Sequence, residues 1–280
     1  MNLQGNSELK TRVATGLIGG GLLLALMIWG GWMVMFVLTT ALSLGLVYEY
    51  TQMAFKLSDR QEKTYFLLGL TWAVSCLNLF LGQSEFGLLI FSFLALFIYF
   101  LVTAQRYEGD GQVALLSHLK ELAFSFFGIF YLAFLPTYLR KIYEGPSGVH
   151  WVLVFLFINW AGDTGAYFVG KKYGKTKLYP LVSPKKSWEG AWGGLAASVA
   201  ITLIYKLIFF NKLSLFGALI IPLLVGTMAQ VGDFCESLIK RAFGQKDSGA
   251  ILPGHGGLLD RFDGVVFSLP IMYACIRVFA

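Results

Sequence analysis

Long apolar runs are the feature that most constrains what this chain can fold into. A helix needs about 20 predominantly apolar residues to cross the hydrocarbon core of a bilayer. Nine runs approach that length, near residues 13–30, 32–50, 64–82, 86–104, 121–142, 150–170, 188–210, 215–238 and 262–280. Only 14% of the residues are charged, whereas a soluble domain carries about 25%. The sequence therefore predicts an all-α polytopic membrane protein with about nine transmembrane helices.

The chain shows no division into independent domains, because it contains no repeat, low-complexity segment or long linker. The first apolar run is too long for a signal peptide and lacks a small-residue cleavage site, so we expect it to be retained as a span. We expect one integral unit. Its N-terminal membrane region, residues 1–142, has about five helices, and its C-terminal membrane region, residues 143–280, has about four helices and the main polar loops.

The Lys and Arg residues predict the orientation of the chain in the membrane. With nine spans, 17 of the 22 fall on the side that holds the N-terminus and 5 on the other side. The positive-inside rule then places the N-terminus and the polar loops in the cytoplasm and the C-terminus outside, in a multi-pass protein of the cell inner membrane. The net charge of +6 does not indicate nucleic-acid binding, because there is no separate basic domain or basic helix.

Polar side chains interrupt the apolar pattern in two regions, both on the predicted cytoplasmic side. The first is INWAGDTGAYFVGKKYGKTKLYPLVSPKKSWEG, residues 158–190. Asp163 lies inside an apolar run, where an ionisable side chain is costly and marks a candidate functional residue. Tyr167 and Gly170 share its helical face. The alternative is that Asp163 only forms a hydrogen bond between helices.

The segment SPKKSWEG, residues 183–190, places cations ahead of a helix. Ser187 suits the N-cap position, and Glu189 lies in the first turn, where negative charge is favoured. Lys185 and Lys186 then stand just before the helix N-terminus. That arrangement suits a polyphosphate.

The second polar region, VGDFCESLIKRAFGQKDSGAILPGHGGLLDRFDG, covers residues 231–264 and holds five of the chain's 16 acidic residues. Asp233, Glu236 and Lys240 lie along one face of a helix. Asp260 and Asp263 are again three residues apart. Carboxylates gathered near a bilayer need compensating cations, and Mg²⁺ is usually held by one or two carboxylates together with substrate phosphates.

The glycine-rich loop of this region suits an anion. Gly256 and Gly257 allow backbone N–H groups to converge on a ligand, although a plain turn accounts for them equally well. His255 alone is more often a structural hydrogen-bonding residue than a catalytic one. Arg261 either balances the neighbouring aspartates or binds a phosphate. In combination, these features describe metal-assisted phosphoryl chemistry at a membrane surface.

The string SLIKRAFGQKDSGAILPGHGGLLDRFD, residues 237–263, closely resembles the signature of the phosphatidate cytidylyltransferases, also called CDP-diglyceride synthases. The signature positions are filled here by Ser237, Lys240, Arg241, Lys246, Asp247, Gly249, Pro253, His255, Gly256, Gly257, Asp260, Arg261 and Asp263. The pieces DTGAYFVGKKYGK and SPKKSWEG resemble a second block of the family. The resemblance is specific over residues 163–263, while the first five spans match only in being hydrophobic.

The resemblance implies a nucleotidyltransferase of phospholipid biosynthesis that transfers a cytidylyl group from CTP to phosphatidic acid. The products would be CDP-diacylglycerol and pyrophosphate, and Mg²⁺, with room for a second cation, would be the cofactor. Residues 143–280 would then be the catalytic region, the bilayer would hold the lipid substrate, and the family suggests a homodimer. The attacking lipid phosphate is already ionised at neutral pH, so no protein nucleophile is required.

These implications give each polar residue an expected role. The metal ligands are expected to be Asp233, Asp260 and Asp263, supported by Asp163 or Asp247. The full catalytic set is expected to be Asp233, Lys240, Arg241, Lys246, Asp247, His255, Asp260, Arg261 and Asp263. The substrate-binding set is expected to be Asp163, Tyr167, Ser183, Lys185, Lys186, Glu189, Ser237, Gly256 and Gly257.

Three other readings of the chain stay open. An ion-coupled secondary transporter also contains buried carboxylates and glycine-interrupted helices, but it should place them near the midplane, often in related halves. A CDP-alcohol phosphotransferase would share the pattern Asp-x-x-Asp-Gly at residues 260–264, but the paired aspartates that should follow are missing from VVFSLPIMYACIRVFA. In the third reading, the charged loops only anchor a structural membrane protein.

Overall fold

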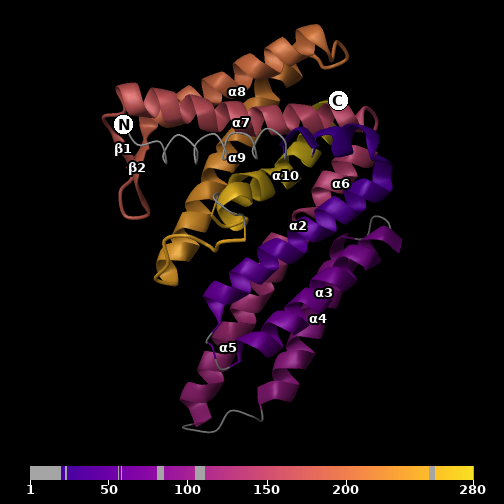
Figure 1. Ribbon diagram of the computed structural model, residues 1–280, viewed down its shortest axis with the longest axis vertical. Helices are drawn as coiled ribbons and strands as arrows, with labels where there is room; N and C mark the ends of the chain where they lie inside the picture. The colour runs from indigo at the N-terminus through magenta and orange to yellow at the C-terminus, as the bar shows by residue number, and fades with distance from the viewer. Residues whose placement is uncertain are drawn as a thin grey trace, which may run out of the picture.

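The structure is a computed structural model that describes residues 20–22, 24–55, 57, 59–80, 85–104, 111–251 and 256–279. It is a helical assembly with one short β-hairpin (Figure 1). The helices of its N-terminal part are α2 Gly31–Ala54, α3 Arg60–Phe80, α4 Glu85–Thr103, α5 Gly111–Gly128, the π-helix η2 Ile129–Phe134 and α6 Thr137–Glu144. The C-terminal part contains α7 Gly148–Tyr173, β1 Lys177–Tyr179, β2 Ser183–Ser187, α8 Trp188–Ile208, α9 Leu215–Ala242 and α10 Leu259–Phe279.

Seven segments of the described chain are long and apolar enough to cross a membrane, which confirms the predicted all-α polytopic fold. They are α2, α4, the continuous stretch Gly111–Glu144, α7, α8, α9 and α10. The run predicted at 64–82 forms α3, which is not among the seven and begins with the charged residues Arg60, Glu62 and Lys63. Residues 13–19 and 23 of the run predicted at 13–30 lie outside the described residues, and the rest includes the shorter apolar helix Gly20–Trp29, which is not among the seven. The count of nine spans therefore stays a prediction.

The buried apolar side chains form two clusters that share helices. One cluster lies around α7, α9 and α10, and the other around α2, α3, α4 and η2. Helix α2 contributes Met35 to the first cluster and Leu46 to the second, and α10 contributes Leu269 and Leu259 in the same way. The two membrane regions are thus joined through common helices, while the boundary at residue 142 stays a prediction.

Helices α7 and α8 lie side by side (Figure 1), and small residues let them approach closely. A Cβ atom added at Gly165 would lie 2.6 Å from the Cβ of Ala197 and 2.8 Å from the carbonyl oxygen of Gly193. Small residues serve the same purpose in other membrane helices, where van der Waals packing drives association.

A second close approach joins α9 to α10. A Cβ atom at Gly232 would lie 2.8 Å from the carbonyl oxygen of Asp263, and one at Gly264 would lie 2.7 Å from that of Ala229. These two glycines each stand next to an aspartate in the sequence, at positions 233 and 263. The crossing of α9 and α10 therefore brings two predicted site residues together.

Candidate active site

The lysine-bearing segment forms a hairpin between α7 and α8. Strands β1 and β2 are antiparallel, with Lys177 opposite Ser187 and Tyr179 opposite Ser183. The Ser187 hydroxyl accepts a hydrogen bond from the backbone N–H of Gly190 at 3.2 Å, which confirms the predicted N-cap of α8. The hairpin is therefore held at a fixed helix N-terminus.

Glu189 has a role that its position in the sequence did not predict. Its carboxylate accepts hydrogen bonds from the backbone N–H groups of Lys175, at 3.2 Å, and Thr176, at 3.1 Å. These bonds hold the segment that leads from α7 into β1. Glu189 was predicted to bind substrate, and its contacts here are with the chain itself.

Lys186 connects the two polar regions of the sequence. Its ammonium group forms an ion pair with the carboxylate of Asp233 on α9. It also lies 4.4 Å from the ring centroid of Phe234, a cation–π contact. The hairpin before α8 and the polar half of α9 therefore meet, as the predicted shared site requires.

Two further carboxylates, from two other helices, lie near this ion pair. Asp233 is close enough to Asp163 on α7 and to Asp263 on α10 to interact with both electrostatically, and Lys186 is the cation that acts on both of these aspartates. The Oδ1 atom of Asp263 accepts the N–H of Gly264 at 2.6 Å. The backbone carbonyl of Asp263 accepts the hydroxyl hydrogen of Tyr131, from η2, at 3.1 Å.

When all three carboxylates are ionised, they carry more negative charge than Lys186 alone can balance. A divalent cation would compensate it, so Asp163, Asp233 and Asp263 fit Mg²⁺ by charge and by donor type. No group of three or more His, Cys, Asp or Glu side chains within the described residues is close enough together to hold a metal ion as the side chains stand. The metal ligands therefore stay a prediction.

Lys240 is enclosed by two other carboxylates. Its Nζ atom lies 2.7 Å from Oε2 of Glu236 and 2.5 Å from Oδ1 of Asp260. Glu236 is almost fully buried, with 1% of its side chain exposed, and Lys240 is 13% exposed. Asp260 was predicted to be a metal ligand beside Asp233, but the two aspartates are bound to different lysines.

The other carboxylate oxygen of Asp260 organises the glycine-rich loop. Oδ2 accepts the backbone N–H groups of Ser248, at 3.0 Å, and Gly257, at 3.2 Å. Gly256 has a positive φ of 83°, in the region that favours glycine. A Cβ atom at Gly257 would clash with the hydroxyl of Ser248. The N–H of Gly257 thus points to a carboxylate of the chain itself rather than outward to a substrate anion.

Glu49 on α2 is a site residue that sequence reasoning missed. Its carboxylate accepts the N–H of Leu259, at 2.8 Å, and the hydroxyl hydrogen of Ser248, at 3.2 Å. Only 1% of the residue is exposed. The signal that singled out Asp163, an acidic residue inside an apolar run, was weaker at Glu49, which lies one residue from the end of the run predicted at 32–50.

The remaining predicted residues surround this network or lie apart from it. Ser183 and Ser237 are half-buried. The exposed members of the predicted sets are Asp163, Tyr167, Lys185, Arg241, Lys246, Asp247, Gly256 and Arg261. The Arg241 guanidinium donates to the backbone carbonyl of Gln245 at 3.3 Å. His255 lies outside the described residues.

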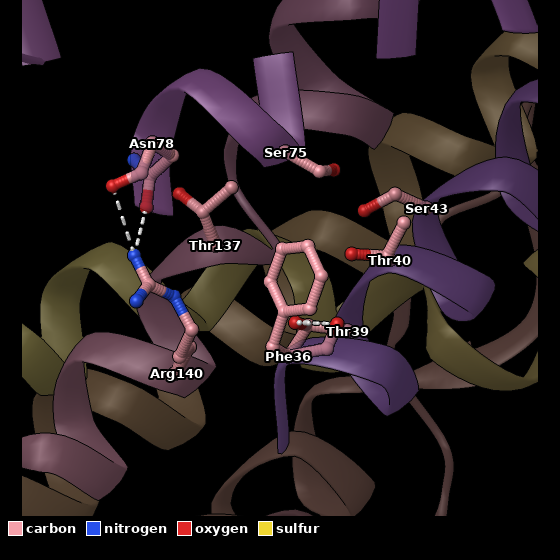
Figure 2. A pocket seen from close by; sticks show the side chains of 8 residues that line it. All are labelled: Phe36, Thr39, Thr40, Ser43, Ser75, Asn78, Thr137 and Arg140. Carbon is pink, nitrogen blue, oxygen red and sulfur yellow. Dashed lines mark hydrogen bonds between the residues drawn. The ribbon is translucent and has the colours of Figure 1, made fainter. Parts of the chain in front are cut away.

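A polar pocket between α2, α3 and α6 contains none of the predicted site residues (Figure 2). Its lining consists of Phe36, Thr39, Thr40, Ser43, Ser75, Asn78, Thr137 and Arg140. Arg140 donates to Glu144 at 2.7 Å and to Asn78. The pocket holds no carboxylate to bind a cation, and its arginine already has a carboxylate partner. It is therefore separate from the candidate active site.

Comparisons with known proteins agree with these features. A model of the cytidylyltransferase family matches residues 10–279. The phosphatidate cytidylyltransferase of Brucella suis biovar 1 (strain 1330) is 34% identical over 275 residues, which cover 98% of this chain and 95% of that protein. The protein of the same name in Bacillus subtilis (strain 168) is 33% identical over 200 residues, 71% of each chain. The likeness therefore extends well beyond residues 163–263 into the N-terminal spans, which had been expected to match only in hydrophobicity.

Proposed function

The chain belongs to the cytidylyltransferase family, and from this premise we propose that it transfers a cytidylyl group from CTP to phosphatidic acid. The products are CDP-diacylglycerol and pyrophosphate, and the reaction is a step of phospholipid biosynthesis. The similarity to proteins named phosphatidate cytidylyltransferase, one of them over 98% of this chain, supports this pair of substrates.

The contact between Lys186 and Asp233 is the observation that carries the proposal. It joins the lysine-bearing hairpin to the acidic half of α9. Both substrates are polyanions, so their charges must be neutralised before one phosphate can approach the other. A lysine held beside a carboxylate can take a phosphate oxygen as its partner when the nucleotide binds.

The reaction itself asks for little covalent chemistry from the protein. An oxygen of the lipid phosphate forms a bond to the α-phosphorus of CTP, and the bond from that phosphorus to the bridging oxygen breaks, so that pyrophosphate leaves. The attacking oxygen is already ionised at neutral pH. The work of the chain is therefore to bind, to orient and to neutralise charge.

In this proposal Asp233 and Asp263 hold Mg²⁺, and Asp163 supports them. The excess of carboxylates around Lys186 supports this assignment. A bound Mg²⁺ would supply charge neutralisation to the phosphates. Asp260 instead supports the site from within, since its carboxylate already binds Lys240 and the backbone of the loop.

Phosphatidic acid would enter from the cytoplasmic leaflet, with its acyl chains among the spans and its phosphate at the site. The uneven distribution of Lys and Arg supports a cytoplasmic site and an outside C-terminus. Exposed lysines at the end of α7 and on the hairpin, including Lys172 and Lys185, suit the anionic headgroups at that surface. The inner membrane and a homodimer are supported by the family resemblance.

The test is to incubate the purified protein in detergent with labelled CTP, phosphatidic acid and Mg²⁺ and to follow label that becomes lipid-soluble. We expect CDP-diacylglycerol to form and to require both the lipid and the metal. Absence of transfer under every metal and lipid condition would overturn the proposal. Counterflow of a solute in proteoliposomes without any lipid product would favour a transporter instead.

A further inference from the structure

We infer that Glu49, in the N-terminal half of the chain, is a positioning residue for the loop that precedes α10. Its Oε2 atom accepts two hydrogen bonds from residues about 200 positions later, the hydroxyl of Ser248 and the N–H of Leu259. The inference rests on the proposed function, because the loop it would position belongs to that active site.

The first contact stabilises the start of α10. Leu259 is the first residue of this helix, and the first N–H groups of a helix have no partner within it. A carboxylate that accepts such a group also interacts favourably with the positive end of the helix dipole. Glu49 therefore caps α10 from another helix. This contact fixes the position of the start of α10, where Asp260 and Asp263 lie.

The second contact connects Glu49 to Lys240 through two intermediate residues. The Ser248 hydroxyl donates to Glu49 and accepts the N–H of Asp260 at 3.3 Å. Asp260 in turn binds Lys240 through Oδ1 at 2.5 Å. Displacement of Ser248 would therefore also displace the carboxylate that orients this lysine.

The shape of the loop is matched to the carboxylate of Glu49. A Cβ atom at Gly249 would lie 2.7 Å from Oε1 of Glu49 and 2.9 Å from its Cδ. The backbone can pass this closely only without a side chain, which explains physically why a small residue occupies that signature position. Oε1 has no hydrogen-bond partner within the described part of the chain, so the carboxylate is held by its other oxygen.

Three variants of the full chain test the inference, assayed by transfer of label from CTP to phosphatidic acid. Glu49→Ala removes both hydrogen bonds, Ser248→Ala breaks the same connection from the loop side, and Glu49→Gln keeps an oxygen that can accept both. The matched control is Glu121→Gln, because Glu121 is also a buried carboxylate of the N-terminal half and forms an ion pair with Lys63 on α3, at 2.7 Å.

We expect Glu49→Ala and Ser248→Ala to raise KM for CTP and to lower kcat per folded enzyme. Because each variant loses buried hydrogen bonds, kcat/KM should fall about 10- to 100-fold. Glu49→Gln should recover most of this loss. Trypsin should cleave faster after Lys246 in Glu49→Ala. Glu121→Gln should lower only the yield of folded protein and leave KM for CTP unchanged.

Two results would overturn the inference while the wild type is active. One is a Glu49→Ala enzyme with wild-type KM and kcat per folded molecule. The other is a Glu49→Ala enzyme that, like Glu121→Gln, loses folded protein at unchanged KM. If Glu49→Ala does not fold, Ser248→Ala decides by the same criteria. An inactive wild type would instead count against the proposed function, so the two failures are distinguishable.

Discussion

Lys185 and Lys186 are neighbours in the sequence, yet the structure separates them. Both lie on β2, where successive side chains point to opposite faces. Lys186 binds Asp233, while Lys185 is exposed. The sequence predicted that both lysines would lie before α8. Which of the two has an acidic partner depends on the position of α9, about 50 residues later, and could not be predicted.

This difference predicts that Lys186 contributes far more to the reaction than the other lysines of the hairpin. Lys186→Ala should lower kcat/KM for CTP about 10²- to 10³-fold, the loss typical when one preorganised donor is removed from an electrostatic site. Lys177→Ala, on the paired strand, is the matched control and should change it little. Steady-state kinetics of both purified variants measure this, and equal losses would contradict the assignment.

The aspartates of α10 are predicted to differ in their relation to Mg²⁺. Asp263→Asn should raise the Mg²⁺ concentration for half-maximal activity about tenfold, equivalent to about 1.4 kcal/mol of metal binding. Asp260→Asn should lower kcat without that shift, because its carboxylate binds Lys240 and the loop. Mg²⁺ titrations of activity distinguish the two variants. If Asp260→Asn also raised the Mg²⁺ concentration for half-maximal activity, Asp260 would be a metal ligand, as the sequence predicted.

Sequence reasoning found most of the polar residues that meet at the site and missed Glu49. Asp163, Asp233 and Asp263 stand out because acidic residues are rare in apolar surroundings. Glu49 has the same character, but its partners Ser248 and Leu259 lie 199 and 210 positions away. A contact across that distance has no local pattern.

At the scale of elements, a π-helix gives the N-terminal half a direct contact with the site. The segment η2 interrupts the path from α5 to α6, and its Tyr131 donates a hydrogen bond to the backbone of Asp263. A π-helical turn is wider than an α-helical one and often occurs at functional positions. The apolar run 121–142 predicted a helix here but not this change of geometry.

The close packing of α7 on α8 predicts a strong effect of one methyl group. Gly165→Ala would bring a Cβ to 2.6 Å from that of Ala197, so we expect it to lower the free energy of unfolding by about 1–3 kcal/mol. Gly69→Ala, within α3, has no neighbour inside 4 Å and should be neutral or stabilising by up to about 1 kcal/mol. Thermal unfolding in detergent compares the two, and equal midpoints would contradict the packing argument.

At the scale of the whole molecule, the fold class could be predicted because it depends on local hydrophobicity. Seven of the predicted apolar runs correspond to described segments able to span a membrane. The sharing of α2 and α10 between two buried clusters could not be predicted, because apolar runs do not specify which helices pack together. Met35 and Leu269, for example, are far apart in the sequence but belong to the same cluster. The same helices carry Glu49 and the aspartates of α10, so the shared core also supports the site.

The orientation of the whole molecule is predicted by its charges and can be measured without reference to activity. In a chain freed of Cys76, Cys235 and Cys275, single cysteines replace Lys177, on the hairpin, or Lys212, between α8 and α9, both of which are exposed. Because one membrane span separates them, an impermeant maleimide should label only Lys212→Cys in spheroplasts and Lys177→Cys in inside-out vesicles. The reverse pattern would place the active site outside, away from cytoplasmic CTP, and labelling of both from one side would show that α8 does not cross the bilayer.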